Sequence, residues 1–522
     1  MSQLEIYPRI DTTPSEDQDE KYCQSITRLS PIDEMDVPVS HKVSNSISVA
    51  IPPPDERNVS LPELSKMKMV LLAINIMLTY FIATASVTAT TLLLPKIAED
   101  LGTSQLQTQW VVSAYTLTYG CTLMVSGRFA DLYGRKMLFL SGLAVAAVFS
   151  ILSAVIRNLI AICVLRALVG LGLAISSPAG FGIIGVTFRK EPARSVAFAA
   201  FGLGAPVGST TGTILGGAVA DLGKHGWAYL FYIIAGLAAI PCLLGLWIIP
   251  SDHRFLRAQA GDRRIDWLGG GLVTTAVFLL SFSITESGQV ASGWKTPWII
   301  VMLVLSLLLF IIFGFWEHHL ETRTTLPPII KISLFSRHGW KLTAINLTAF
   351  CIMFSAFSVL YTLALFYQDY KGLDALGNAI RLLPSNITGL FAAGGVMYLA
   401  PRFRAPVLIV LGCIATGSTS LLLAVEPRGT RYWYCEFWAL ILFPPGIDFT
   451  VCLGNIMISN LVSDDEQSVA GALFQLNTQI AAVLGVCCSS LIVTTRTQAT
   501  GDILVGLRSA WWMSAAFAWC SE

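Results

Sequence analysis

Long apolar runs separated by short polar connectors fill the chain from Met69 onward. Each run matches the roughly 17 to 25 residues that an α-helix needs to cross about 30 Å of hydrocarbon. The pattern predicts an all-α polytopic membrane protein with about fourteen transmembrane helices. We place them at residues 69–94, 108–127, 137–156, 160–187, 195–217, 227–249, 267–285, 297–316, 342–367, 376–399, 405–425, 433–460, 467–494 and 503–520.

The connectors divide the chain into four parts. Residues 1–66 are rich in Ser, Pro, Asp and Glu and poor in large apolar residues, so we expect a disordered cytoplasmic tail. A six-helix bundle is expected at 67–250, a linker with two extra helices at 251–320, and a second six-helix bundle at 321–522. Only Ser521 and Glu522 follow the last predicted helix, so a second bundle that is truncated at its end is an alternative.

Similar segments follow the second helix of each predicted bundle. Ala130-Asp131-Leu132-Tyr133-Gly134 leads to Gly142, and Ala400-Pro401-Arg402-Phe403-Arg404 leads to Gly412. Paired bundles related by an axis along the membrane normal are a known transporter plan. The similarity favours two related halves.

The basic residues of the connectors predict the orientation, because short loops rich in Lys and Arg stay in the cytosol. Such residues precede the third, fifth, seventh, ninth and eleventh predicted helices, which places them all on one side. Arg428 and Arg431 are a mild exception on the other side. We expect both termini in the cytosol, and the plasma membrane as the location, with the vacuolar membrane as the alternative.

Composition excludes several function classes. Hydrophobic residues make up 54% of the chain and charged residues 13%, against about 25% charged in soluble domains. The net charge is +1 and no basic block suggests a nucleic-acid partner. The six histidines fall in predicted loops or the tail, and no Gly-rich loop ends in Gly-Lys-Ser or Gly-Lys-Thr. We therefore expect neither a metal-dependent membrane enzyme nor an ATP-driven pump, and no cofactor.

The connector after the second helix carries the most specific motif, Gly-Arg-Phe-Ala-Asp-Leu-Tyr-Gly-Arg-Lys. Gly127 and Gly134 are seven residues apart and permit a tight turn. Asp131 can pair with Arg135 or with a helix end. Together with Lys136, these residues are expected to form a cytoplasmic gate; an ordinary basic loop is the alternative.

This motif resembles the loop between helices two and three of the major facilitator superfamily. Four further segments resemble its fourteen-helix drug:proton antiporter branch, as found in fungi: Leu94 to Tyr115, Asp266 to Gly269, Phe366 to Pro384, and Gln475 to Gly485. The resemblance covers the chain from about Met69. It implies secondary active transport by alternating access, with protons as the coupling ion, by a monomer.

Two residues are candidates for proton coupling. Arg166 lies inside an apolar span, where an arginine costs at least ~2.5 kcal/mol, and the resemblance links the matching arginine to coupling. An interfacial or purely structural arginine is the alternative. The family often has an aspartate nine residues before Pro95, where this chain has Ser86. Asp448 is our substitute, ahead of Glu286 and Asp369 near helix ends.

The fifth predicted helix carries a glycine pattern that resembles the antiporter motif of exporters. Thr213 stands where that motif has a proline, while a proline occurs earlier in the helix. Simple helix packing is the alternative, because small residues let helices approach closely. The residues of interest are Pro206, Gly208, Gly212, Gly216 and Gly217.

Polar and aromatic residues of several spans can line a substrate cavity between the bundles. For each residue alone, packing or an interfacial aromatic belt is the alternative. The candidates are Trp110, Tyr115, Asn346, Tyr361, Gln368, Gln475, Asn477 and Gln479, with Phe354 as a further wall.

These observations predict an exporter of a small, partly apolar organic molecule, such as a drug, toxin or secondary metabolite. A proton-driven importer, a vacuolar loader and a non-transporting receptor on the same fold remain alternatives.

Overall fold

The computed structural model describes residues 65–220, 222–223, 225–250, 264–290, 293–336, 339–373, 375–400 and 402–520. Residues 1–64 of the predicted tail lie outside these residues, and its last residue, Lys66, begins α2. Helices make up the described part, and no strand occurs in it.

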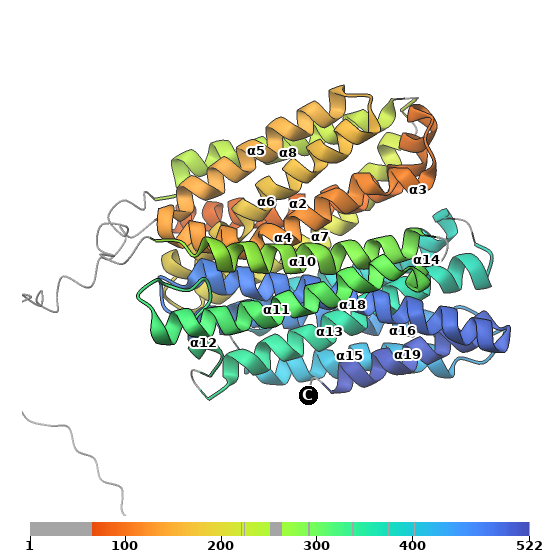
Figure 1. Ribbon diagram of the computed structural model, residues 1–522. Coiled ribbons are helices and arrows are strands. Elements are labelled where there is room, and N and C mark those ends of the chain that lie inside the picture. Colours follow the sequence, from red (N-terminus) through yellow and green to blue (C-terminus); the bar gives the residue numbers. More distant parts are fainter. Residues whose placement is uncertain are drawn as a thin grey trace, which may run out of the picture. The chain divides into compact units, whose positions relative to one another are not determined.

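The helices follow one another along the chain in three groups (Figure 1). The first group is α2 (Lys66–Leu101), α3 (Gln105–Thr108), α4 (Trp110–Tyr133), α5 (Arg135–Val155), α6 (Leu159–Thr187), α7 (Ala193–Ala220) and α8 (Gly226–Ile248). The second is α10 (Trp267–Gln289), the turn η2 (Gly293–Lys295), α11 (Pro297–Arg323) and α12 (Ser333–Ser336). The third is α13 (Lys341–Leu365), the π-helical turn η3 (Phe366–Tyr370), α14 (Ala375–Leu399), α15 (Ala405–Val425), α16 (Glu436–Leu442), α17 (Pro444–Leu461), α18 (Gln467–Thr500) and α19 (Ile503–Trp519).

Every predicted span corresponds to a helix, with two differences at prolines. The first span does not end at Leu94, because α2 continues through Pro95 and ends at Gly102, whose φ of 62° suits glycine. The predicted span 433–460 is two helices, because α16 stops at Leu442 and α17 starts at Pro444. Proline lacks an N–H group and fits best in the first turn of a helix, as Pro444 does in α17, although α2 continues through Pro95.

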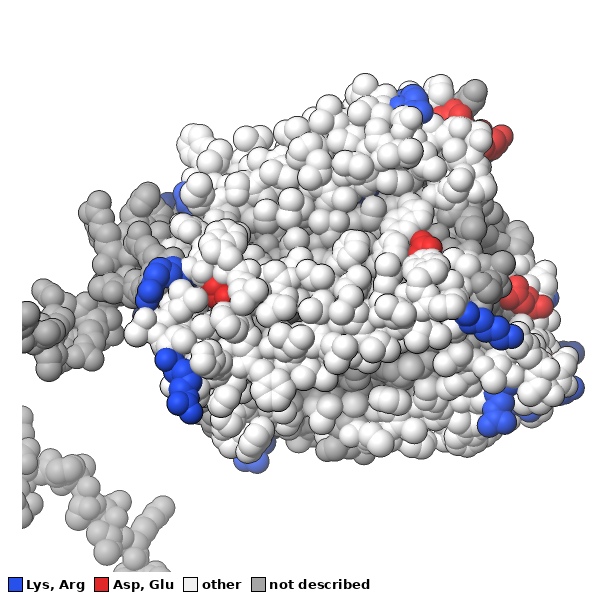
Figure 2. Space-filling model, in the orientation of Figure 1, with Lys and Arg blue, Asp and Glu red and all other residues white. Residues whose placement is uncertain are grey.

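Eleven of the described helical segments are long and apolar enough to cross a membrane. Three helices fall outside that set: α4 is rich in Thr and Tyr, α7 is rich in Gly, and α19 has only 17 residues. All three pack among the apolar helices, α4 on α6, α7 on α2 and α19 on α15. On the face drawn in Figure 2, charged residues lie toward the two ends of the helices and a wide uncharged band separates them.

Two bundles and an extra helix pair make up the fold. α2 and α4 to α8 pack on one another, as do α13 to α19, while α10 and α11 pair and α10 also contacts α4 and α18. In each half, the similar segment leads to a glycine at which two helices approach closely. A Cβ on Gly142 of α5 would lie 2.4 Å from the Gly172 oxygen of α6, and one on Gly412 of α15 would lie 3.0 Å from Cα of Gly446 in α17.

The glycine pattern of α7 packs this helix against α2. Added Cβ atoms would lie 2.6 Å from a backbone oxygen of α2 at Gly204, 2.4 Å at Gly208, 2.7 Å at Gly212 and 2.9 Å at Gly216. Gly217 faces open space instead. Pro206 lies inside α7, which continues past it. The four buried glycines therefore allow two helices to touch along four turns.

We predict that Gly212→Val destabilises the protein by about 1–3 kcal/mol, because the new side chain overpacks a close contact. Its Cβ would lie 2.1 Å from Thr88 Oγ1. Gly217→Val is the matched control, since it changes helix propensity equally at an open position. Thermal unfolding of both purified variants in detergent measures the difference; equal melting temperatures would contradict this account of the contact.

Candidate functional site

A buried ion pair lies where α4 turns into α5. Arg135 donates to Asp131 Oδ1 from Nε at 3.0 Å and from Nη2 at 2.7 Å. Both side chains are at most 5% exposed. The pair is formed within one turn of chain because Gly134, with φ of 113°, lets α5 begin directly after α4.

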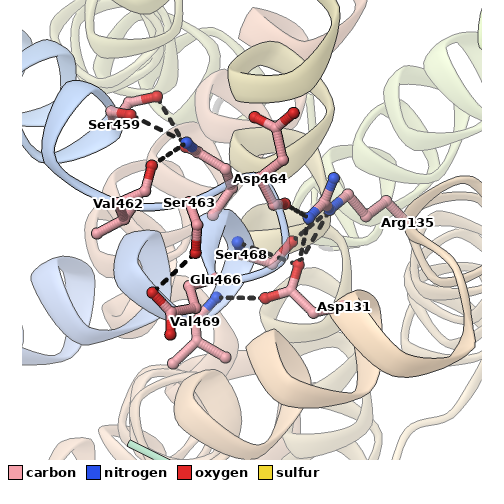
Figure 3. A network of polar contacts seen from close by, with 10 residues as sticks. Asp131, Arg135, Ser459, Val462, Ser463, Asp464, Glu466, Ser468 and Val469 are labelled. Carbon is pink, nitrogen blue, oxygen red and sulfur yellow. Dashed lines mark hydrogen bonds and ion pairs between the residues drawn. The ribbon is translucent and has the colours of Figure 1, made fainter. Parts of the chain in front are cut away.

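The same pair binds the N-terminus of α18 in the other bundle (Figure 3). Asp131 accepts hydrogen bonds from Ser468 N at 3.3 Å and Val469 N at 3.0 Å. Arg135 donates to Ser468 Oγ at 3.1 Å and to the Asp464 carbonyl oxygen. A carboxylate is favoured here because the first N–H groups of a helix have no partner within it and carry partial positive charge. We call Asp131, Arg135, Asp464, Ser468 and Val469 the latch.

Two further arginines of the first bundle hold the connection between α17 and α18. Arg189 Nη2 lies 2.9 Å from Asp464 Oδ2, and Arg194 Nη2 donates to the carbonyl oxygen and the hydroxyl of Ser459, each at 2.7 Å. The Arg189 pair is about half exposed and contributes little by itself. The latch end of the molecule is thus joined by charged and polar contacts between the bundles.

Two residues of the predicted gate motif, Gly127 and Lys136, do not contribute to the turn or the latch as expected. Gly127 does not form the turn: it lies inside α4, and a Cβ there would be 2.7 Å from Cβ of Ala472 in α18. Its smallness lets α18 approach α4. Lys136 donates from Nζ to the carbonyl oxygens of Leu246 at 3.0 Å and Ile249 at 2.6 Å, so it caps the end of α8 within its own bundle.

Arg166 is fully buried between helices of the first bundle. It donates to Ser86 Oγ at 2.9 Å and to the Val111 oxygen at 3.3 Å, and the Tyr115 ring centroid lies 4.6 Å from its Cζ. Nη2 has no hydrogen-bond partner. Among the described residues, no carboxylate lies within ion-pair distance of Arg166. The Ser86 hydroxyl occupies the position from which an acid would have balanced this charge.

Gln475 joins three helices at the interface between the bundles. Its Oε1 accepts from Tyr119 of α4 at 3.2 Å and from Ser177 of α6 at 2.9 Å. Tyr119 stacks on Tyr115, with ring centroids 6.2 Å apart. An unbroken series of contacts therefore connects the Arg166 charge with the interface.

Asp448 of α17 is a buried acid, 8% exposed. Its Oδ2 has no hydrogen-bond partner, and a Cβ on Gly389 of α14 would lie 3.4 Å from that oxygen. In the part of the chain that the structure describes, no cationic side chain lies within ion-pair distance of it. Asp448 can therefore gain or lose a proton without first breaking an ion pair.

Glu436, another buried acid, has cationic partners. At the end of the C-terminal half opposite the latch, Lys371 Nζ pairs with Glu436 Oε1, and Arg381 Nη1 lies 3.9 Å from Oε2. Glu426 follows α15 beside this group, and burial, with the neighbouring Glu436, raises the pKa of its carboxyl to about 7. These contacts stay within one bundle.

The predicted cavity residues are dispersed. Tyr115 is 2% exposed and donates to the Ala83 oxygen at 3.2 Å. Trp110 packs on Phe282 of α10, and Phe354 stacks on Phe517 within the second bundle. Asn477 donates to the backbone oxygen of Asn346 at 2.7 Å.

The remaining candidates are less constrained. Tyr361 and Gln479 are half-buried, and Gln368 is exposed on η3. Tyr119, Ser177, Asp464 and Ser468 were not predicted, because nothing in their local sequence marks them.

Comparison with known proteins identifies the family. Residues 76–486 match the model of the Major Facilitator Superfamily. An efflux pump of Aspergillus terreus is 26% identical over 433 residues, covering 82% of this chain and 81% of the pump. The methylenomycin A resistance protein of Bacillus subtilis is 26% identical over 444 residues, covering 84% and 88%.

A solved structure has the same fold. The human organic anion transporter MFSD10 superposes with a TM-score of 0.62 at 14% identity, covering 88% of this chain and 99% of its own. Two bundles in the membrane, joined at one end by a charged latch, are the architecture of a secondary transporter. The chain belongs to the Major Facilitator Superfamily.

We predict that Asp131→Ala destabilises the latch by about 3–5 kcal/mol, since it leaves Arg135 buried without its carboxylate. The double variant Asp131→Ala with Arg135→Met should recover part of the loss, because no uncompensated charge remains. Thermal unfolding followed by tryptophan fluorescence compares the two, with Lys66→Met, which changes an exposed lysine at the start of α2, as a control. A double variant no more stable than Asp131→Ala would show that the pair does not act as a unit.

Proposed function

We propose that the protein exports a small, partly apolar organic molecule in exchange for protons. The observation that carries this proposal is the latch, which joins the two bundles at one end through bonds to the N-terminus of α18. Such a contact can be broken and remade as a whole, because helix ends and side chains separate without unfolding either bundle. This suits a cycle in which the bundles rock about a central site.

The direction of transport and the substrate class rest on different support. An efflux pump and an antibiotic resistance protein are among its relatives. The interface carries hydroxyl, phenol and amide groups at Ser177, Tyr119 and Gln475 among apolar residues. Such walls suit a solute with both apolar surface and hydrogen-bonding groups. The candidate cavity residues keep this role as a proposal.

Arg166 and Asp448 carry the coupling in this proposal. Arg166 provides a fixed buried charge in the first bundle, and Asp448 provides an acid without a fixed partner in the second. Proton uptake by Asp448 changes the charge facing α14, and the substrate leaves when that charge changes again. The latch closes the cytosolic side, and both termini lie in the cytosol. The protein acts as a monomer in the plasma membrane. The buried glycines of α7 hold this helix against α2 during the cycle.

The first test is efflux of fluorescent amphiphilic compounds from cells that express the chain, with and without a protonophore. We expect protonophore-sensitive efflux that Arg166→Ala abolishes while the protein stays in the membrane. Arg496→Ala is the matched control, because Arg496 is exposed near the end of α18.

Either of two outcomes would count against this assignment. Full efflux by Arg166→Ala would remove this residue from the mechanism. No efflux by correctly located wild-type protein would favour an importer, a vacuolar loader or a receptor.

We further predict that Asp448→Asn abolishes the dependence of transport on the proton gradient, because the amide cannot exchange a proton. Asp369→Asn should transport as the wild type does, since Asp369 is exposed on η3. Substrate-induced proton release from purified protein, measured with a pH indicator, gives the answer. Undiminished proton release by Asp448→Asn would show that another acid carries the proton.

A further inference from the structure

The α10–α11 pair contacts both bundles next to the latch. One apolar cluster contains residues of α4, α10, α11, α18 and the segment between α11 and α12: Cys121, Met124, Val273, Val277, Phe313, Ile329, Ile330, Val469 and Leu476. We call residues 324–336 the strap. Because α4 and α18 are also the helices that the latch joins, the strap and the latch act on the same interface.

Two buried acids fix the pair at this end. Asp266 caps α10, accepting from Gly269 N at 2.9 Å and from Trp316 Nε1 of α11 at 3.0 Å. Glu317 of α11 is fully buried. A Cβ on Gly269 would lie 2.0 Å from Asp266 Oδ2 and 2.7 Å from Glu317 Oε1. The absence of a side chain at Gly269 therefore lets both carboxyl groups reach the same point.

Glu317 also fixes the course of the strap. Its Oε2 accepts from Ile330 N at 3.3 Å, and Ile329 and Ile330 are 3% and 5% exposed. The next residue, Lys331, places Nζ 2.6 Å from Oε1 of Glu466. A series of contacts thus runs from the extra helices through the strap to the connection between α17 and α18.

Glu466 is the residue before α18 begins. Its carboxyl also accepts from Ser463 Oγ at 3.0 Å, and three residues later Val469 N donates to Asp131 of the latch. A displacement of Glu466 therefore changes where the latch meets the helix end. The Glu466 side chain is 10% exposed, so its pairing with Lys331 is better shielded than a fully exposed pair.

We propose that the extra helix pair holds the latch closed through the strap, with Lys331 and Glu466 as positioning residues that set how readily the latch opens. This inference rests on the proposed alternating-access function, in which the latch must open once per cycle. The α10–α11 pair is then part of the opening equilibrium and more than a spacer between the bundles.

Hydrogen–deuterium exchange of the full chain in lipid nanodiscs tests the proposal without substrate or proton gradient. We expect Lys331→Met to speed amide exchange across residues 463–473 by about two- to fivefold, the factor expected for losing a partly exposed ion pair. Lys341→Met, which removes an exposed lysine at the start of α13, is the matched control and should leave exchange unchanged. Equal rates in wild type and Lys331→Met, or equal acceleration by Lys341→Met, would overturn the proposal.

Glu317 provides an independent test of the strap. Glu317→Gln keeps an oxygen that can accept from Ile330 N, whereas Glu317→Leu removes the acceptor. We expect faster exchange across 463–473 in the Leu variant and nearly wild-type exchange in the Gln variant. Slow exchange in a folded Leu variant would show that Glu317 does not hold the strap.

The exchange experiment tests the strap and the efflux experiment tests export, so either hypothesis can be rejected while the other is retained. Accelerated exchange in Lys331→Met together with absent efflux by the wild type would reject the export function and retain the strap. Normal exchange in that variant, together with protonophore-sensitive efflux, would reject the strap and retain export.

Discussion

The contact between the Asp131 carboxylate and the free N–H groups at the start of α18 is the constraint on which the rest of the structure depends. This carboxylate is almost completely buried, so it needs partners, and it finds Arg135 in its own bundle and Ser468 and Val469 in the other. Leaving any of these groups unpaired in a buried position is costly. Gly134 and Gly127 serve the same contact, one by permitting the turn and the other by letting α18 come close. The two bundles meet here as one polar unit.

Each bundle also contains a buried charged side chain without an oppositely charged partner among the described residues. The first holds the cation Arg166, whose neighbours are a hydroxyl, a carbonyl oxygen and aromatic rings. The second holds Asp448, which also lacks an oppositely charged partner among the described residues. In a low-dielectric interior, both depend strongly on small changes in their surroundings. In the proposed exchange with protons, such responses come from groups that are not already neutralised.

Sequence predicted the helices and the local ion pair well, because both follow from short-range spacing. Apolar length defines a spanning helix, and a separation of four residues brings Asp131 and Arg135 together where the chain turns. The partners of this pair lie more than 300 residues away in the chain, and no local pattern marks Ser468 as a donor to Asp131 or an acceptor for Arg135. Gly127 was misassigned to the turn because a turn glycine and a close-contact glycine look alike in sequence.

The four buried glycines of α7 also have a consequence for how this protein can diverge. With backbone oxygens of α2 within 3 Å of each potential Cβ, neither helix tolerates larger residues along that line, so α2 and α7 are inherited as one matched surface. New side-chain types must therefore arise away from this line, on the opposite faces of these helices or on other helices. Along the line itself, a mutation in one helix has no compensating mutation available in the other, since glycine is already the smallest residue.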